Sequence, residues 1–187
     1  MCAEIIEKHT KNLYRGGTVS NDMEITYDNS KHRDSEICFF EDQELYNFLN
    51  PLINTANKNG GWNYDWDWFE PIQMTKYGLN QYYSWHKDAF QVTYGEKHAK
   101  EWRGKDRKLS VIISLNDSKD YKGGELIFDN RLYEVDEDRH LNKTECTQYK
   151  KQGTVVVFPS TLHHKVNPIT EGIRHSLVIW CLGPPLR

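Results

Sequence analysis

The amino-acid sequence predicts a mainly β fold, a sandwich or barrel of short strands with a helix packed against its outside. Strand-like segments separated by Gly, Asn, Asp and Pro turns fill the second two-thirds of the chain, and one amphipathic helical pattern precedes them. The chain has 187 residues and a net charge of −3, which is enough length for one domain with a sizeable core. We therefore expect a single domain over 1–187, with an N-terminal extension and helical support in 1–60 and a β core in 61–187.

The N-terminal third contains the helical pattern. Residues 1–35 are polar and lack a sustained period, which predicts irregular structure or a loose edge strand. From Glu41 to Lys58 the period is helical, and Asp42 is a suitable N-cap. Pro51 lies inside this run and predicts a kink or two short helices. The apolar residues expected on one face are Leu45, Phe48, Leu49, Leu52, Ile53 and Ala56.

The following segments change to a period of two. From Trp62 to Trp68 aromatic residues alternate with polar ones, which predicts a strand whose aromatic face packs in the core rather than on a partner. Residues 72–77 continue in extended form, and 78–80 form a turn. Arg131 to Gln152 form a long charged connection, a feature that is usually functional or mobile. Further strands are predicted over Lys108–Leu115, Glu125–Phe128, Gly153–Phe158 and His175–Leu182.

Composition argues against several classes of protein. The mixed charges and a pI of about 6.2 give no basic surplus for nucleic acid. No apolar run approaches the ~20 residues of a membrane helix, and residues 1–20 lack a signal-peptide core. The four cysteines are far apart and form no Cys-x-x-Cys pair. We expect a cytoplasmic protein with reduced thiols, which binds neither membranes nor nucleic acid.

A His-x-Asp pair is the first candidate metal motif, and it occurs twice. His86 and Asp88 follow an aromatic strand and turn, and residues two apart in an extended chain project to the same side. His32 and Asp34 lie in a charged run without a strand pattern, so His32 is interpreted as a solvated loop residue. His98 lies in a polar stretch and is a weaker candidate.

A third ligand must come from elsewhere in the chain. His163 and His164 follow the predicted strand 153–158, and adjacent residues of an extended chain point to opposite sides, so at most one faces a metal. Strand periodicity alone does not choose between them. Two imidazoles and one carboxylate form the facial triad of non-haem Fe(II) oxygenases, which leaves positions open for an organic acid and dioxygen. Arg174 supplies a partner for the far carboxylate of such an acid.

Three blocks of the sequence resemble a known family. The run from Tyr77 to Asp88 is similar to the prolyl 4-hydroxylase-like branch of the 2-oxoglutarate- and Fe(II)-dependent oxygenases, with a tyrosine, a glycine-containing turn, an aromatic residue and then His-x-Asp. Residues 117–128, with their Gly-Gly-Glu segment, resemble the family's next conserved block. Residues 158–180 resemble its closing block. The resemblance extends over roughly 72–180.

The closing block resolves the choice between the two histidines. In the family a histidine precedes a proline by four positions, which selects His164 from Pro168. A basic residue follows that histidine by ten positions, which is Arg174, and arginine here resembles bacterial and phage-type members. The resemblance thus implies that His86, Asp88 and His164 bind Fe(II).

The same resemblance implies a double-stranded β-helix, or jelly roll, that uses Fe(II), 2-oxoglutarate and O2, with ascorbate as a further candidate cofactor. Arg174 is expected to bind the distal carboxylate of 2-oxoglutarate and Tyr77 its keto acid end, and no catalytic residue is expected beyond the metal site. The expected reaction is hydroxylation of a peptidyl proline with release of succinate and CO2. The alternatives are a hydroxylase of a free amino acid or other small molecule and a non-catalytic β-barrel binding module. The 131–152 connection is either a substrate lid or a solvated insertion.

Overall fold

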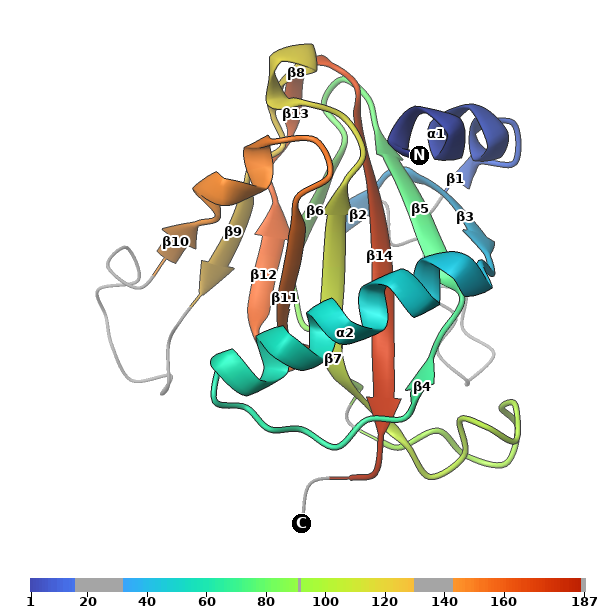
Figure 1. Cartoon of the computed structure of the whole chain (residues 1–187). Helices are drawn as coiled ribbons and strands as arrows, with labels where there is room; N and C mark the ends of the chain where they lie inside the picture. Colours follow the sequence, from blue (N-terminus) through green and yellow to red (C-terminus); the bar gives the residue numbers. More distant parts are fainter. Residues whose placement is uncertain (16–31, 91, 130–142, 186–187) are drawn as a thin grey trace.

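Two antiparallel sheets form the body of the protein (Figure 1). The structure is a computed structural model that describes residues 1–15, 32–90, 92–129 and 143–185. β14 and β7 lie at the centre of the larger sheet, and β4 pairs with β14. The larger sheet contains, in spatial order, β1 (Tyr14–Arg15), β3 (Glu36–Phe40), β5 (Ile72–Tyr77), β14 (Arg174–Gly183), β7 (Asp106–Ser114) and β11 (Val155–Pro159), with β4 (Trp68–Phe69) beside β14.

The smaller sheet carries the predicted histidines. Its strands are, in spatial order, β10 (Lys143–Glu145), β9 (Leu126–Asp129), β12 (His163–Val166), β6 (Tyr82–His86) and β2 (Arg33–Asp34). A two-stranded ribbon of β8 (Tyr121–Gly123) and β13 (Ile169–Gly172) lies at one end (Figure 1). Two short 3-10 helices, η2 (Ser118–Asp120) and η3 (Thr147–Lys150), precede β8 and β11 respectively.

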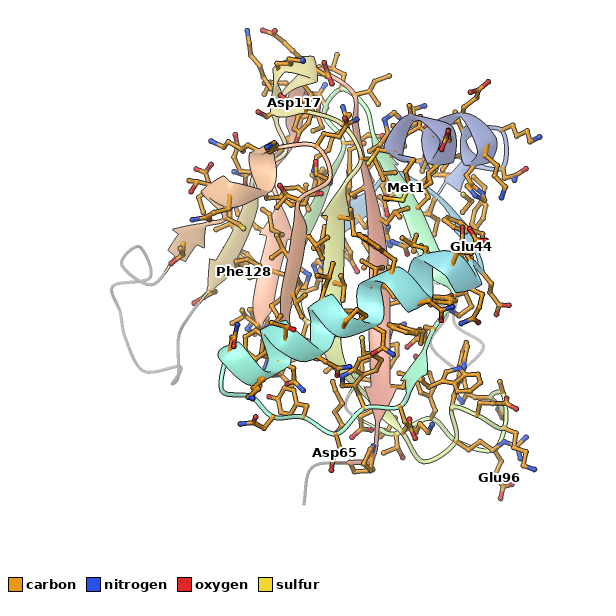
Figure 2. All side chains as sticks on the ribbon, in the orientation of Figure 1. Met1, Glu44, Asp65, Glu96, Asp117 and Phe128 are labelled. Carbon is orange, nitrogen blue, oxygen red and sulfur yellow. The ribbon has the colours of Figure 1, made fainter. Side chains whose placement is uncertain are left out.

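Side chains on the two faces of β7 belong to two different hydrophobic cores. Val111 and Ile113 join the core beneath α2 (Gln43–Asn59), whereas Ile112 joins the core between the two sheets. This follows from the two-residue period of a strand, which sends successive side chains to opposite faces. α2 therefore covers the outer face of the larger sheet, and side chains fill the space between them (Figure 2). The mainly β prediction is confirmed.

The α2 helix agrees with the prediction in extent but not in its buried face. The Asp42 side chain accepts a hydrogen bond from the Leu45 amide at 3.0 Å, as expected of an N-cap. Phe48 and Leu52 are 56% and 45% exposed, so the expected apolar face was wrong at these positions. The face that packs on the sheet is narrower, and its buried residues are Leu45, Tyr46, Leu49, Ile53 and Asn57.

Pro51 does not divide α2 into two helices. It lies on the exposed side, where water can reach the backbone carbonyl that loses its usual N–H partner. The N-terminal segment differs from its prediction too, because α1 (Cys2–Thr10) is a helix. Its inner face consists of Cys2, Ile5 and Ile6, which pack on the core, and the buried His9. These residues have helical spacing, but the run is too short to be recognised within a polar segment.

The aromatic segment 62–68 is not a strand along its length, because only Trp68–Phe69 pairs as β4. Asn57 of α2 replaces a strand neighbour here: its side chain accepts from the Tyr64 amide at 3.0 Å and donates to the Tyr64 carbonyl at 2.9 Å. Trp62, Tyr64 and Trp66 nevertheless pack against the core, as predicted. The other predicted strands correspond to β5, β7, β9, β11 and β14. No helix in the described ranges is long and apolar enough to cross a membrane.

Candidate active site

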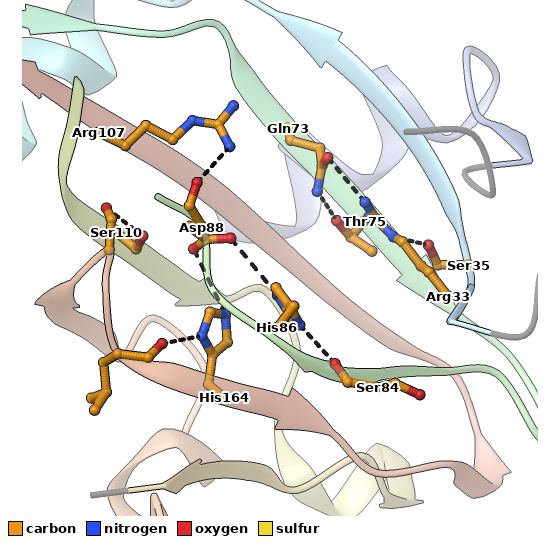
Figure 3. Close-up of polar contacts among 12 residues, drawn as sticks. Arg33, Ser35, Gln73, Thr75, Ser84, His86, Asp88, Arg107, Ser110 and His164 are labelled. Carbon is orange, nitrogen blue, oxygen red and sulfur yellow. Dashed lines mark hydrogen bonds and ion pairs between the residues drawn. The ribbon is translucent and has the colours of Figure 1, made fainter. Parts of the chain in front are cut away.

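Pairing of β6 with β12 brings His86 and His164 opposite each other. Asp88 follows the end of β6 by two residues, and its backbone N–H donates to the Ser160 carbonyl at 3.0 Å. The nitrogen and oxygen atoms of His86, Asp88 and His164 that could bind a metal lie within 4.8 Å of one another. Figure 3 shows the three side chains converging on one point. The structure thus brings together the three residues selected from the sequence.

Backbone carbonyls fix the tautomer of both histidines. His86 Nδ1 lies 2.7 Å from the Ser84 carbonyl oxygen, and His164 Nδ1 lies 3.0 Å from that of Leu162. A carbonyl only accepts, so in the neutral form of each ring Nδ1 carries the proton and the lone pair of Nε2 is free to bind a metal. Both Nε2 atoms lie 3.7 Å from Asp88 oxygens, too far for a hydrogen bond. Such an arrangement suits a cation between them.

Asp88 supplies a second sign that the cluster fits a metal. Its carboxylate is buried, and Oδ2 has no hydrogen-bond partner within the described ranges. Burial alone would raise the pKa of Asp88, but His164, His86 and Arg107 together lower it, so the carboxylate stays ionised. Burial, followed by the proximity of His164, lowers the pKa of His86 to about 3, so this imidazole is neutral. The neutral His86 nitrogen and the ionised Asp88 oxygen belong to the donor set of the Fe(II) facial triad, and His164 would add the second nitrogen.

A buried ion pair holds the backbone at Asp88. Arg107 donates to the Asp88 carbonyl oxygen at 3.3 Å and makes two bonds of 2.6 Å to the Glu70 carboxylate. Its guanidinium lies 3.8 Å from the ring centroid of Trp180. Nothing in the sequence pattern singled out Arg107 or Glu70, which are 37 residues apart and meet only through the sheet.

Arg174 is almost completely buried, at 1% exposure, at the start of β14 opposite Tyr77. It donates to the Tyr149 hydroxyl at 2.6 Å and to Ser176 Oγ at 3.4 Å, while Nε has no partner in the part of the chain that the structure describes. Among the described residues, no carboxylate pairs with it. Burial would lower the pKa of Arg174, but Tyr149, Tyr77 and Tyr121 raise it, so the charge persists. A buried cation without a counter-charge indicates an anion site.

Tyr149 and Gly124 complete this site, and sequence reasoning did not identify either role. Tyr149 lies in η3, inside the 131–152 connection, so this part of the connection is folded rather than a solvated insertion. Gly124 has φ +68°, and a Cβ there would lie 3.0 Å from Arg174 Cδ. The Gly-Gly-Glu segment thus brings backbone close to the arginine side chain.

One cavity of about 640 Å3 connects the two sites. Arg174, Ser176, Val178 and Trp180 alternate on the cavity side of β14, and Tyr77 lines the wall near Arg174. His32 lies in a turn, as expected, but it is half-buried rather than fully solvated: it lines the cavity with its ring 6.3 Å from that of His86. The reason is pairing of β2 with β6, which draws this charged segment onto the sheet.

The remaining candidates lie outside the cluster. His163 is exposed on the strand face opposite to His164, as strand alternation requires. His98 is near Gly95, and its Nδ1 lies 3.3 Å from the Gly95 carbonyl oxygen. Neither histidine belongs to the metal-type cluster found among the described residues.

Comparisons with known proteins agree with this geometry. A PKHD-type hydroxylase of Psychrobacter sp. (strain PRwf-1) is 33% identical over 110 residues, 59% of this chain and 37% of the relative. A PKHD-type hydroxylase of Thermosynechococcus vestitus is 30% identical over 112 residues, 59% of this chain and 42% of the relative. The match thus spans roughly two-fifths of the length of these relatives.

Solved structures confirm the jelly-roll fold. The viral collagen prolyl hydroxylase of Paramecium Bursaria Chlorella virus-1 superimposes with a TM-score of 0.61 at 18% identity, covering 97% of this chain and 89% of that one. A Pseudomonas putida prolyl-4-hydroxylase gives a TM-score of 0.63 at 17% identity, covering 96% and 82%. A Trichoplax adhaerens prolyl hydroxylase bound to a hypoxia inducible factor peptide gives 0.65 at 15% identity, covering 96% and 74%. Residues 72–182 match the family model, and the chain belongs to the 2OG-Fe(II) oxygenase superfamily.

Proposed function

We propose that this protein is a 2-oxoglutarate- and Fe(II)-dependent dioxygenase that hydroxylates a peptidyl proline. The observation that carries the proposal is the buried Arg174, which lacks a carboxylate partner and lines the same cavity as His86, Asp88 and His164. A non-catalytic barrel would have no reason to keep a buried cation and an orphaned carboxylate oxygen in one cavity, because each costs stability.

Each residue has a role in the proposed reaction. Nε2 of His86, Nε2 of His164 and the Asp88 carboxylate would hold Fe(II), and the Nδ1 hydrogen bonds orient both rings. Arg174 and the Tyr149 hydroxyl would bind the distal carboxylate of 2-oxoglutarate in charge-assisted hydrogen bonds. When bound, Fe(II) and 2-oxoglutarate supply the chemistry that activates O2 and hydroxylates a C–H bond, with release of succinate and CO2.

The walls of the cavity would exclude water from the reacting centre. Val178 lies between Arg174 and Trp180 on the cavity side of β14, and Ile112 lines the cavity from β7. Tyr77 packs within the same wall at 3% exposure, with the Arg174 guanidinium 5.2 Å from its ring centroid. Its hydroxyl is a candidate donor to the bound keto acid. An apolar wall with a few convergent polar groups is the usual form of such a pocket.

The choice of a peptidyl proline rests on similarity. The curated relatives are PKHD-type hydroxylases, and the solved neighbours are prolyl hydroxylases, one of them bound to a peptide. A hydroxylase of a free amino acid or other small molecule is the second candidate. A substrate lid and a solvated insertion stay the alternatives for the 131–152 connection, of which 131–142 lie outside the described residues. Ascorbate as a cofactor stays a prediction.

The decisive experiment is turnover with defined substrates. The purified protein, loaded with Fe(II), is incubated with 2-oxoglutarate, O2 and either proline-containing peptides or free amino acids. We expect succinate formation coupled to a peptide product that is heavier by one oxygen atom. Product from free amino acids alone would replace the peptide proposal with the second candidate. Absence of 2-oxoglutarate turnover with every compound, despite bound Fe(II), would overturn the proposed activity.

A further inference from the structure

The guanidinium of Arg33 lines the cavity beside the metal-type cluster, in addition to those of Arg107 and Arg174. Arg33 lies on β2, opposite Tyr83 of β6, and its Cζ lies 4.7 Å from the Tyr83 ring centroid. The Tyr83 ring in turn stacks on the His86 ring at 3.5 Å. The Tyr83 ring therefore lies between Arg33 and a residue of the cluster. Figure 3 shows Arg33 and His86 on neighbouring parts of the same site.

Hydrogen bonds fix the position of the Arg33 guanidinium, and one of its nitrogens makes none to a described residue. Its Nε donates to Ser35 Oγ at 2.8 Å, and one terminal nitrogen donates to Gln73 Oε1 at 3.4 Å. Gln73 is itself fixed, because its amide donates to Thr75 Oγ1 at 2.8 Å. The second terminal nitrogen of Arg33 has no partner among the described residues, although Arg33 is only 9% exposed. A positioned, unpaired donor of this kind favours an anionic ligand.

The charges that line the cavity lead to the same conclusion. Arg107 is paired with Glu70, and the charges of Fe(II), 2-oxoglutarate, Asp88 and Arg174 would cancel one another. Two positive side chains then remain without an acidic partner among the described residues, the buried Arg33 and the exposed Lys87. The charged residues of the cavity wall are Arg33, Lys87, Asp88, Arg107 and Arg174.

We infer that Arg33 binds a carboxylate of the substrate, so that the enzyme selects an acidic substrate over its neutral counterpart. This inference rests on the proposed function and narrows its substrate class. The carboxylate belongs either to an Asp or Glu side chain near the target residue or to a free α-carboxylate. The competing interpretation is structural: Arg33 only stacks on Tyr83 and stabilises the sheet through a cation–π contact.

Matched peptides test the inference. Each synthetic peptide holds one proline, and a single Asp is moved from three residues before it to three residues after it. Every Asp peptide has an Asn counterpart, and free L-proline and its amide form the second pair. A charge-assisted hydrogen bond predicts that kcat/KM for the preferred acid exceeds that of its amide by about tenfold to a hundredfold. Preference within the peptide pairs identifies a side-chain carboxylate, whereas preference within the proline pair identifies an α-carboxylate.

Three variants assign the preference to Arg33. Arg33→Met should abolish it, and Arg33→Lys should retain part of it, because the charge persists without the planar fork. Arg103→Met is the matched control, since Arg103 is exposed and does not line the cavity, and it should leave the preference intact. Equal turnover of acids and amides by the unmodified protein, or a preference that survives in Arg33→Met, would overturn the inference. Thermal unfolding checks that each variant is folded.

A binding measurement keeps this test separate from that of the proposed function. Propionate and propionamide, then benzoate and benzamide, are compared for the shift in melting temperature of the anaerobic complex with Fe(II) and 2-oxoglutarate. If no proline compound is turned over, the peptidyl-proline proposal fails, yet selective stabilisation by the carboxylates that is lost in Arg33→Met still supports the anion site. Equal shifts for acid and amide would overturn it.

Discussion

Replacing Arg174 with methionine should separate the stability of the protein from its affinity for 2-oxoglutarate. The change removes hydrogen bonds to Tyr149 and Ser176. Each buried hydroxyl left without its partner costs about 1–3 kcal/mol. The change also removes a buried charge that has no acidic partner among the described residues, and burying such a charge costs several kcal/mol. Because these contributions oppose each other, the melting temperature of the ligand-free variant should stay close to that of the parent.

Binding of 2-oxoglutarate should behave differently. A hydrogen bond to a charged group contributes about 1.5–3 kcal/mol, so the variant should lose about tenfold to a hundredfold in affinity. At a concentration 100 times Kd, 2-oxoglutarate stabilises the unmodified protein by about 2.7 kcal/mol. At the same concentration the variant should gain only about 1.4 kcal/mol after a tenfold loss, or about 0.4 kcal/mol after a hundredfold loss.

The assay is thermal unfolding of the Fe(II)-loaded protein under anaerobic conditions over a series of 2-oxoglutarate concentrations. Iron content, measured after desalting, should be nearly the same in both proteins. Arg174→Lys is the matched control, because it keeps the charge and loses the bidentate geometry, and its affinity should lie between the two. An Arg174→Met variant with unchanged 2-oxoglutarate affinity would refute the assignment of this cavity wall as the cosubstrate site.

Four further outcomes are expected. His164→Ala should abolish Fe(II) binding, whereas His163→Ala should bind the parent's amount of metal, measured by elemental analysis; the reverse result would show that the strand register is wrong. Tyr149→Phe should raise the apparent KM for 2-oxoglutarate by about tenfold to a hundredfold, since a hydrogen bond to a charged carboxylate contributes about 1.5–3 kcal/mol; an unchanged KM would remove Tyr149 from the site. Arg107→Met should weaken Fe(II) binding in equilibrium titrations although Arg107 is not a ligand, because the Asp88 backbone loses its support; parent-like affinity would contradict this role. Chelation of the metal should leave the circular dichroism spectrum intact, because strand pairing and not the metal holds the cluster together; unfolding on chelation would contradict that view.

Local patterns were sufficient to predict several of the individual elements. β5 and the Asp42 cap of α2 agree with the prediction because each depends on residues close in sequence. Prediction failed where a distant residue substitutes for a local partner. The Asn57 amide satisfies the Tyr64 backbone, so the aromatic alternation around it never needs a strand neighbour. The helical spacing of Ile5 and His9 in α1 was present but too short to be distinguished from irregular structure.

The residues of the candidate site were likewise predictable only where they lie close together in the sequence. His86 and Asp88 are two residues apart, so alternation in an extended chain predicts their common direction. The hydrogen-bond partners of Arg174 and Arg33 cannot be recognised from sequence spacing. Tyr149 reaches Arg174 across 25 residues, and Gln73 reaches Arg33 across 40. These contacts depend on which strands become neighbours, which periodicity does not encode.

The arrangement of charge in the cavity suits the several ligands that are proposed to bind there. Without them, the cavity contains an orphaned carboxylate oxygen at Asp88, an unpaired guanidinium nitrogen at Arg174 and another at Arg33. Each unpaired group costs stability in isolation, and each has a geometry that a complementary ligand would satisfy. Three such groups in one cavity are difficult to explain as packing defects of a core. They fit a site in which a metal, a dicarboxylic keto acid and an acidic substrate neutralise one another, so binding of each should favour binding of the next.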